Sequence, residues 1–313
     1  MHYRIGADAS TLHGPILPER APLLTVQSGD TIEFDLLDAG WHLAAPAHGQ
    51  EPSRHPARQA GHALIGPVAV QGAEPGMALE VEVLRLEPGS WGWTRAGGFD
   101  SPINRALGLV GQEAAELLTW QIDAAAGLAS SRGFSLPICP FLGWIGLCPA
   151  EPGPHSTTPP RSVGGNLDCR ELVAGSKLFL PVARTGALLS VGDGHAAQGD
   201  GELSGTAIEC PMRAALRLTL HPVPQRPFPR AEVPRAPGAP AYITFGLSED
   251  LNAASVQATA AMLDWICQKY GVTQSVALAL ASPSVGLRVT QVANLVWGVH
   301  ATLEPFLGSP AHG

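Results

Sequence analysis

The stretch Ala78–Leu86, with the sequence ALEVEVLRL, decides the fold class of this chain. Leu79, Val81 and Val83 alternate there with two glutamates. Successive side chains of an extended backbone point to opposite faces, so this alternation predicts a strand with one buried face and one solvated face. The same two-residue period recurs in the segments 30–37, 177–182 and 214–220.

Turn-forming residues separate these strands. The chain contains 36 Gly and 29 Pro, which break helices and favour turns. We therefore expect residues 1–220 to form a β-rich body, with two β subdomains as one way of dividing it. Residues 112–129 have a weak pattern that fits either one helix or a short strand with turns.

A proline-rich segment, residues 221–240, follows the β-rich body. Proline lacks an amide hydrogen and has a fixed φ, so we expect this segment to stay outside any sheet interior. It is predicted to be a stiff connector or an extended surface arm, and a disordered segment is the alternative.

The period changes after the connector, in residues 241–313. Apolar residues recur every three or four positions from Leu251 to Ile266, which predicts a helix. Ser248 is the expected N-cap and Gly271 the glycine that ends the helix. A shorter helix over 273–281 and strands over 287–292 and 296–303 complete an α+β C-terminal part.

Composition narrows the range of partners. The net charge of −8 argues against nucleic acid and anionic membranes, both of which select basic surfaces. No apolar run approaches the ~20 residues that cross a bilayer, and the N-terminal segment has no signal-peptide core. Five widely spaced cysteines without a CxxC motif fit reduced thiols. We expect a soluble, cytoplasmic protein.

The segment Gly164–Glu209 carries the most chemistry. It contains three pairs of polar residues two positions apart: Asn166 and Asp168, Asp193 and His195, and Asp200 and Glu202. In an extended backbone, each pair would point to one face. One imidazole among several carboxylates suits a divalent metal, which could activate water and polarise a carbonyl group. Ordinary Asp-Gly hairpin turns are the alternative explanation.

Other candidates lie elsewhere in the chain. His62 could contact a substrate, although a lone histidine is more often structural. Asp38 follows an N-terminal strand and could reach the same site as the acidic pairs. Cys139 and Cys148 flank an apolar loop, but no general base or orienting partner accompanies either thiol in the sequence.

Five blocks of the sequence, in order, resemble the acetamidase/formamidase family. They are GPVAVQGAEPG at 66–76, LPICPFLGWIGLCPAEPG at 136–153, GGNLDCRELVAGSKLFLPV at 164–182, VGDGHAAQGDGELSGTAIE at 191–209 and TQVANLVWGVHATLEP at 290–305. The resemblance covers residues 23 to 305. It implies a mainly β fold with a jelly-roll-like β-sandwich, a second β subdomain and a smaller C-terminal α+β part.

The resemblance also implies hydrolysis of a short amide, such as formamide or acetamide, with a divalent metal near residues 195–202. Zinc is the expected metal, and calcium is the alternative. The expected metal ligands are Asp38, Asp168, Asp193 and His195; the expected catalytic residues are His195, Asp200 and Glu202, with Glu202 as proton shuttle; and Asn166, His62 and Gly199 are expected to contact the substrate. A homo-oligomer is compatible with this function.

Two departures favour an alternative function. Met77 stands where the family usually has an acidic residue after AEPG, and residues 39–60 differ from the family pattern. A non-catalytic or differently specific binding protein of the same fold is therefore the second hypothesis, and a carbohydrate- or partner-binding sandwich is a third. Neither Lys177 nor Lys269 lies beside a nucleophile motif, which disfavours amidase mechanisms that depend on a lysine.

Overall fold

The computed structural model describes residues 1–47, 50, 52–222, 229–235 and 240–304. Within these residues the largest sheet has nine strands. In sheet order they are β1 (His2–Gly6), β4 (Thr31–Leu36), β15 (Met212–His221), β6 (Ala78–Pro88), β13 (Lys177–Pro181), β16 (Arg230–Val233), β17 (Ala241–Ser248), β19 (Trp297–Leu303) and β18 (Val285–Gln291).

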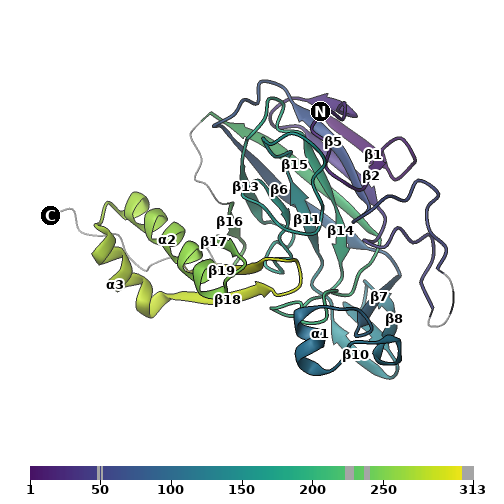
Figure 1. Ribbon diagram of the computed structural model, residues 1–313. Coiled ribbons are helices and arrows are strands. Elements are labelled where there is room, and N and C mark those ends of the chain that lie inside the picture. The colour runs from purple at the N-terminus through teal and green to yellow at the C-terminus, as the bar shows by residue number, and fades with distance from the viewer. Residues whose placement is uncertain (48–49, 51, 223–228, 236–239, 305–313) are drawn as a thin grey trace.

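Two smaller sheets complete the β structure. The six-stranded sheet contains β12 (Gly164–Asn166), β11 (Phe141–Gly146), β14 (Leu189–His195), β5 (Leu64–Val70), β2 (Leu12–His13) and β3 (Leu24–Val26), which pairs with β5. The four-stranded sheet contains β10 (Phe134–Pro137), β9 (Leu128–Ser131), β8 (Glu116–Asp123) and β7 (Trp91–Ala96). Figure 1 shows the four-stranded sheet at one end of the sandwich.

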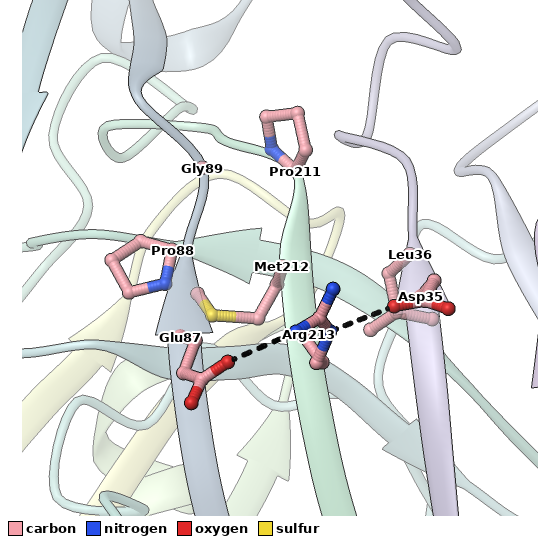
Figure 2. A pocket seen from close by; sticks show the side chains of 8 residues that line it. All are labelled: Asp35, Leu36, Glu87, Pro88, Gly89, Pro211, Met212 and Arg213. Carbon is pink, nitrogen blue, oxygen red and sulfur yellow. Dashed lines mark hydrogen bonds and ion pairs between the residues drawn. The ribbon is translucent and has the colours of Figure 1, made fainter. Parts of the chain in front are cut away.

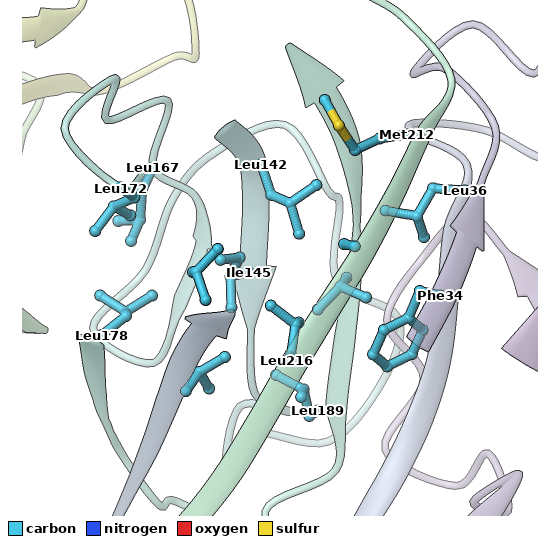
Figure 3. Close-up of a cluster of buried hydrophobic side chains, with 14 of the residues drawn as sticks. Phe34, Leu36, Leu142, Ile145, Leu167, Leu172, Leu178, Leu189, Met212 and Leu216 are labelled. Atoms are coloured by element: carbon cyan, nitrogen blue, oxygen red, sulfur yellow. The ribbon is translucent and has the colours of Figure 1, made fainter. Parts of the chain in front are cut away.

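The main core lies between the nine-stranded and six-stranded sheets. Phe34 of β4 and Leu216 of β15 meet Leu142 and Ile145 of β11 and Leu189 of β14 (Figure 3), and all five side chains are buried. The opposite face of β4 and β6 carries charged residues, as their alternation predicts. The chain is therefore mainly β and contains a β-sandwich, as predicted.

The C-terminal part extends the large sheet and covers it with helices. They are α2 (Leu251–Tyr270) and α3 (Gln274–Ser284); the described residues also contain α1 (Pro102–Leu107) and the 3-10 helix η1 (Gln112–Ala114). Ala258, Met262 and Ile266 of α2 form a second core with β19, so the α+β prediction is confirmed. Asp250 rather than Ser248 caps α2, because its carboxylate accepts a hydrogen bond from the Ala253 amide.

The prediction for residues 221–240 is wrong in one respect. Arg230–Val233 forms β16, which pairs with both β13 and β17 and therefore lies in the sheet interior. These four residues contain no proline, so every amide can join the ladder, whereas Pro229 and Pro234 flank them. Residues 223–228 and 236–239 lie outside the described part. The proposed division of the chain at residues 220 and 240 stays a prediction.

Residues 112–129, which fitted either a helix or a strand, contain η1, β8 and the start of β9. Among the described residues, no helix is both long and apolar enough to cross a membrane.

Candidate metal centre

Five buried side chains converge at one end of the six-stranded sheet. Asp193 and His195 end β14, Asp168 follows β12, and Glu202 and Glu209 lie in the chain between β14 and β15. They form two groups: Asp168, Asp193 and His195, and His195, Glu202 and Glu209. Within each group the candidate ligand atoms lie within 4.8 Å of one another. The two groups share His195, so they form one cluster.

The converging atoms lack hydrogen-bond partners. His195 Nε2 lies 3.2 Å from Asp193 Oδ1 and 3.3 Å from Glu209 Oε2, yet these contacts do not have hydrogen-bond geometry. Asp168 Oδ1 and Glu202 Oε2 are also buried without a hydrogen bond. Buried polar atoms are nearly always paired, and the described protein atoms do not pair these. A cation coordinated by these atoms would satisfy them together.

Gln198 determines that the Nδ1 nitrogen of the His195 ring carries a proton. Its amide nitrogen donates to the Asp168 carbonyl at 2.8 Å, which directs its amide oxygen to His195 Nδ1 at 3.0 Å. Nδ1 therefore carries a proton, and when the imidazole is neutral, as a metal ligand must be, Nε2 presents a lone pair to the cluster. Metal-binding histidines are commonly oriented by such a hydrogen bond on the other ring nitrogen.

Backbone conformation at the cluster is unusual. Asp168, Asp193 and Glu202 have φ values of 50°, 60° and 46°, in the left-handed region that non-glycine residues seldom adopt. Such conformations persist where surrounding structure enforces them, and they are frequent at functional sites.

Gly143 of β11 leaves the space that the cluster fills. A Cβ atom at this position would lie 2.5 Å from Asp193 Oδ2, 2.6 Å from Asp168 Oδ1 and 2.7 Å from His195 Cε1. These distances are too short for any side chain to fit without moving the cluster.

Burial and mutual repulsion dominate the electrostatics. Burial, reinforced by the charge of Asp193, raises the pKa of Asp168 well above its ordinary value, and burial with the charge of Asp168 does the same for Glu202. Burial also raises the pKa of Glu209 to about 7, although His195 opposes it. For Asp193, burial is outweighed by His195 and His62, and its pKa is lowered. Carboxylates that repel one another in a buried site are stabilised by a bound cation.

The imidazole responds to the same surroundings. Burial lowers the pKa of His195, but the negative charges of Glu209 and Asp193 outweigh burial and raise it well above its ordinary value. The cluster therefore attracts positive charge strongly.

Segments far apart in the sequence complete the cluster. Glu209 reaches it because its backbone bridges both His195 and Trp93. Asn294, in the turn between β18 and β19, donates a hydrogen bond to Asp168 Oδ2. The sequence prediction did not include Glu209, Gln198, Asn294 or Gly143. Glu209 lies within the quoted acidic segment, but it has no partner two positions away that would single it out.

The members of the other two predicted pairs have different surroundings. Asn166 donates to the Thr158 carbonyl at 3.0 Å, although its own carbonyl oxygen is buried and unpaired. Asp200 is partly exposed and lies 3.6 Å from Arg288, outside the cluster. Asp193 and His195 are the pair that both point into it.

Asp38 and His62 belong to neither group of candidate ligands, although His62 acts on the charge of Asp193. The Asp38 carboxylate accepts hydrogen bonds from Trp93 Nε1 at 2.6 Å and from the His42 amide at 2.7 Å, and it pairs with His42 Nδ1 at 2.7 Å. These contacts hold the carboxylate away from the cluster, to which Asp38 contributes no candidate ligand atom. The His62 ring contacts the Thr157 hydroxyl at 2.8 Å.

A cavity of about 540 Å³ adjoins the cluster. Glu202 belongs to both, and Gln198, Gly199 and Asp200 also line the cavity. A small substrate in this cavity would therefore contact the cluster at Glu202.

A separate hollow of about 360 Å³ lies on the outer face of β4, β6 and β15 (Figure 2). Arg213 there pairs with Asp35 at 3.0 Å and with Glu87 at 3.5 Å. The charged side chains that line this hollow are paired with one another, and no cluster residue lines it. This hollow therefore offers no unpaired ligand groups.

Met77 and the described part of the segment 39–60 contribute no residue to the cluster. Met77 packs against the main hydrophobic core. In the segment 39–60, His42 is buried and paired with Asp38, while residues 48, 49 and 51 lie outside the described part.

The chain is similar to several known proteins. A Schizosaccharomyces pombe protein proposed to be a formamidase is 28% identical over 255 residues, covering 62% of this chain and 60% of its own length. The formamidase of Methylophilus methylotrophus is 24% identical over 247 residues, with the same coverage. The chain thus matches about 60% of the length of these relatives.

The crystal structure of an acetamidase from Bacillus halodurans superimposes with a TM-score of 0.84, at 27% identity and with 96% of each chain covered. The sequence itself matches the acetamidase/formamidase family over residues 3–156 and 150–303. Since these matches span nearly the whole chain, the protein belongs to the acetamidase/formamidase family.

Proposed function

We propose that this protein hydrolyses a linear amide to a carboxylate and ammonia at the cluster around His195. The observation that carries the proposal is the convergence of buried, unpaired ligand atoms beside a cavity. The family names two amide-hydrolysing activities, which agrees with this chemistry. Amide hydrolysis needs a group that polarises the carbonyl, an activated water molecule and a proton carrier. The cluster offers ligands for a metal that would polarise the carbonyl and activate water, and a carboxylate that would carry the proton.

Asp168, Asp193, His195 and Glu209 would hold a divalent metal. His195 has one free ring nitrogen, because Nδ1 is bonded to Gln198, so the two overlapping groups would share one ion. The imidazole favours zinc, whereas the carboxylates would also accept calcium. We propose zinc, with calcium as the alternative. When bound, the metal would supply a Lewis acid and lower the pKa of water.

Glu202 is the proposed proton carrier, because it borders both the cluster and the cavity. In the reaction, the oxygen of water bonds to the carbonyl carbon and the C–N bond breaks. The nitrogen must gain a proton to leave as ammonia, and Glu202 can take that proton from the attacking water and deliver it. Asp200 and Gly199 line the same cavity and are assigned to contact with the substrate.

Other amidase mechanisms fit the structure less well. Lys177 Nζ lies 3.2 Å from Glu80 Oε1 on the solvated side of the large sheet, and the two groups form an ion pair. Cys139 lines the cavity but is exposed, and none of the described contacts pairs it with a base. A binding protein with an inactive site remains the second function, motivated by Met77 and the segment 39–60.

Ammonia release from formamide, acetamide and propionamide tests the proposal. We expect wild type to be active with zinc, and both a chelator and His195→Ala to reduce the rate by at least about 100-fold. His2→Ala changes an exposed histidine of β1 and should retain full activity. Circular dichroism checks that each variant is folded. A folded, metal-loaded wild type that releases no ammonia from any amide would favour the binding function.

A further inference from the structure

The surface of the cavity beside Glu202 is mostly apolar and comes from side chains in several parts of the chain. Its apolar members are Trp120, Leu136, Pro137, Ala197, Leu203, Ala207 and Ile208. The indole nitrogen of Trp120 donates to Thr94 Oγ1 at 3.0 Å, so the ring adds apolar surface without an unpaired donor. A mostly apolar cavity with a few polar groups is typical of a pocket that holds an organic ligand.

Leu203 follows Glu202 directly and is more exposed than Trp120, Leu136 and Ile208 of this lining. It is 69% exposed, although it lies beside a side chain that is almost fully buried. Its Cδ2 would lie 3.1 Å from a Cβ atom at Gly201, so the leucine packs over that glycine. Exposed apolar surface at the mouth of a pocket is typical of a contact surface for an apolar ligand.

The size of the cavity exceeds what the smallest amides need. Formamide and acetamide are only a few times larger than a water molecule, which occupies about 30 Å³ in the liquid. The cavity of about 540 Å³ lies within the range of about 300–1,000 Å³ for pockets that hold much larger ligands. A short amide bound near Glu202 would leave most of the apolar wall without contact.

We propose that this protein prefers amides with an extended apolar acyl group, which Trp120, Leu136 and Leu203 contact while the amide lies at Glu202. This inference rests on the proposed amidase function and specifies its substrate class. The apolar group gains free energy by leaving water, and each added methylene group in contact with the wall increases kcat/KM. Arg170 and Asp200 also line the cavity, so an acyl chain that ends in a carboxylate is the competing substrate.

The test measures kcat/KM of the zinc-loaded protein for acetamide, hexanamide and the analogue of hexanamide with a terminal carboxylate. We expect hexanamide to exceed both of the others by about 10-fold or more. Leu203→Ser should lower the ratio of hexanamide to acetamide by about 10-fold. Leu278→Ser, at a 54% exposed leucine of α3 that does not line the cavity, is the matched control and should leave the ratio unchanged.

The outcomes separate the two proposals. Ammonia from acetamide at a rate equal to or above that from hexanamide overturns the substrate preference and leaves the amidase function intact. A preference for the carboxylate-bearing analogue also overturns it and identifies Arg170 as the contact. No ammonia from any of the three amides contradicts the proposed function itself. An unchanged ratio in Leu203→Ser contradicts the role of that side chain.

Discussion

At the scale of single residues, Gly143 determines how closely the carboxylates of the centre can approach the strand beneath them. The space that a Cβ would occupy at position 143 already holds two carboxylate oxygens and an imidazole carbon. The residue lies in the interior of β11, between two paired strands, so the backbone cannot retreat easily.

Gly143→Ala is therefore expected to displace Asp168, Asp193 or His195 and to reduce amide hydrolysis by about 100-fold, because small misplacements of catalytic groups have effects of that size. Zinc content by elemental analysis should fall in parallel. Gly286→Ala in β18 is the control, since a Cβ there meets nothing within 4 Å. Full zinc content and activity in Gly143→Ala would show that the cluster tolerates displacement and is not a preorganised centre.

The residue scale also shows the limit of reading pairs from the sequence. The two-residue spacing brings Asp193 and His195 together, because both lie in β14. It does not do so for Asp200 and Glu202, since both lie in the loop between β14 and β15, where the two-residue period of a strand does not apply. Asp38 follows an N-terminal strand as expected, but nearby donors bind its carboxylate.

At the scale of elements, the turn between β18 and β19 connects the C-terminal part to the site. Gln291 is fully buried, and its side-chain oxygen Oε1 accepts hydrogen bonds from the backbone amides of Ala293 and Asn294. Its side-chain nitrogen Nε2 donates to the backbone carbonyl of Val296. These three bonds hold the turn in the shape that presents Asn294 to Asp168. A parallel bridge between Gly201 and Gln291 adds a contact with the loop that carries Glu202.

We expect Asn294→Ala to weaken zinc binding by about 10-fold or more, because partners that orient metal ligands typically contribute about 10–100-fold. The free energy of unfolding should fall by about 1–3 kcal/mol, since Asp168 Oδ2 would lose its buried donor. Titration with zinc and urea denaturation measure the two effects, and Asn252→Ala on the exposed side of α2 is the control. Wild-type zinc affinity in Asn294→Ala would contradict the role of the β18–β19 turn in orienting Asp168.

Local sequence patterns predicted the elements better than their pairing. Alternation identified β4 and β6, and helical periodicity identified α2, because burial of one face imposes these periods. The strand β16 escaped prediction, since its four residues are too few for a period and prolines flank them. Asn294 and Glu209 could not be assigned to the site, because pairing between distant segments brings them there, and no local pattern encodes that pairing.

At the scale of the whole molecule, His13 connects β2 to β14 inside the six-stranded sheet. Its Nε2 lies 3.0 Å from the Ser190 hydroxyl, and Nδ1 lies 3.3 Å from the Pro15 carbonyl. Nδ1 therefore donates to the carbonyl, and Nε2 accepts from the hydroxyl, which requires a neutral ring. Burial lowers the pKa of His13 from 6.5 to about 4.

A lowered histidine pKa means that the unfolded chain binds a proton more readily than the folded one. The contribution of His13 to stability is therefore complete above pH 6.5 and is lost as the pH falls towards 4. Between pH 7 and pH 5 this loss amounts to about 2 kcal/mol. Urea denaturation of His13→Gln should show a pH dependence weaker by that amount, whereas His2→Gln, at an exposed histidine, should match wild type. An unchanged dependence in His13→Gln would contradict a neutral buried ring.

The overall architecture explains why the sequence identified the segment that holds most of the site but did not predict which distant residues meet there. The block at 191–209 contains four of the five cluster residues, and its resemblance to one family indicated the chemistry of the site. The approach of β12, β14 and the β18–β19 turn depends on the packing of the complete sandwich. The cavity and its apolar wall have the same origin, since their residues come from the four-stranded sheet and from loops that connect strands of different sheets.

The most direct test of the account follows ammonia release from acetamide while zinc is added back to protein stripped by a chelator. We predict no significant rate without metal and a rate that rises with bound zinc until one ion is bound per chain. Calcium is added in a parallel titration to separate the two candidate metals. Full activity in the stripped protein, with the chelator still present, would contradict a metal-dependent reaction at the cluster around His195.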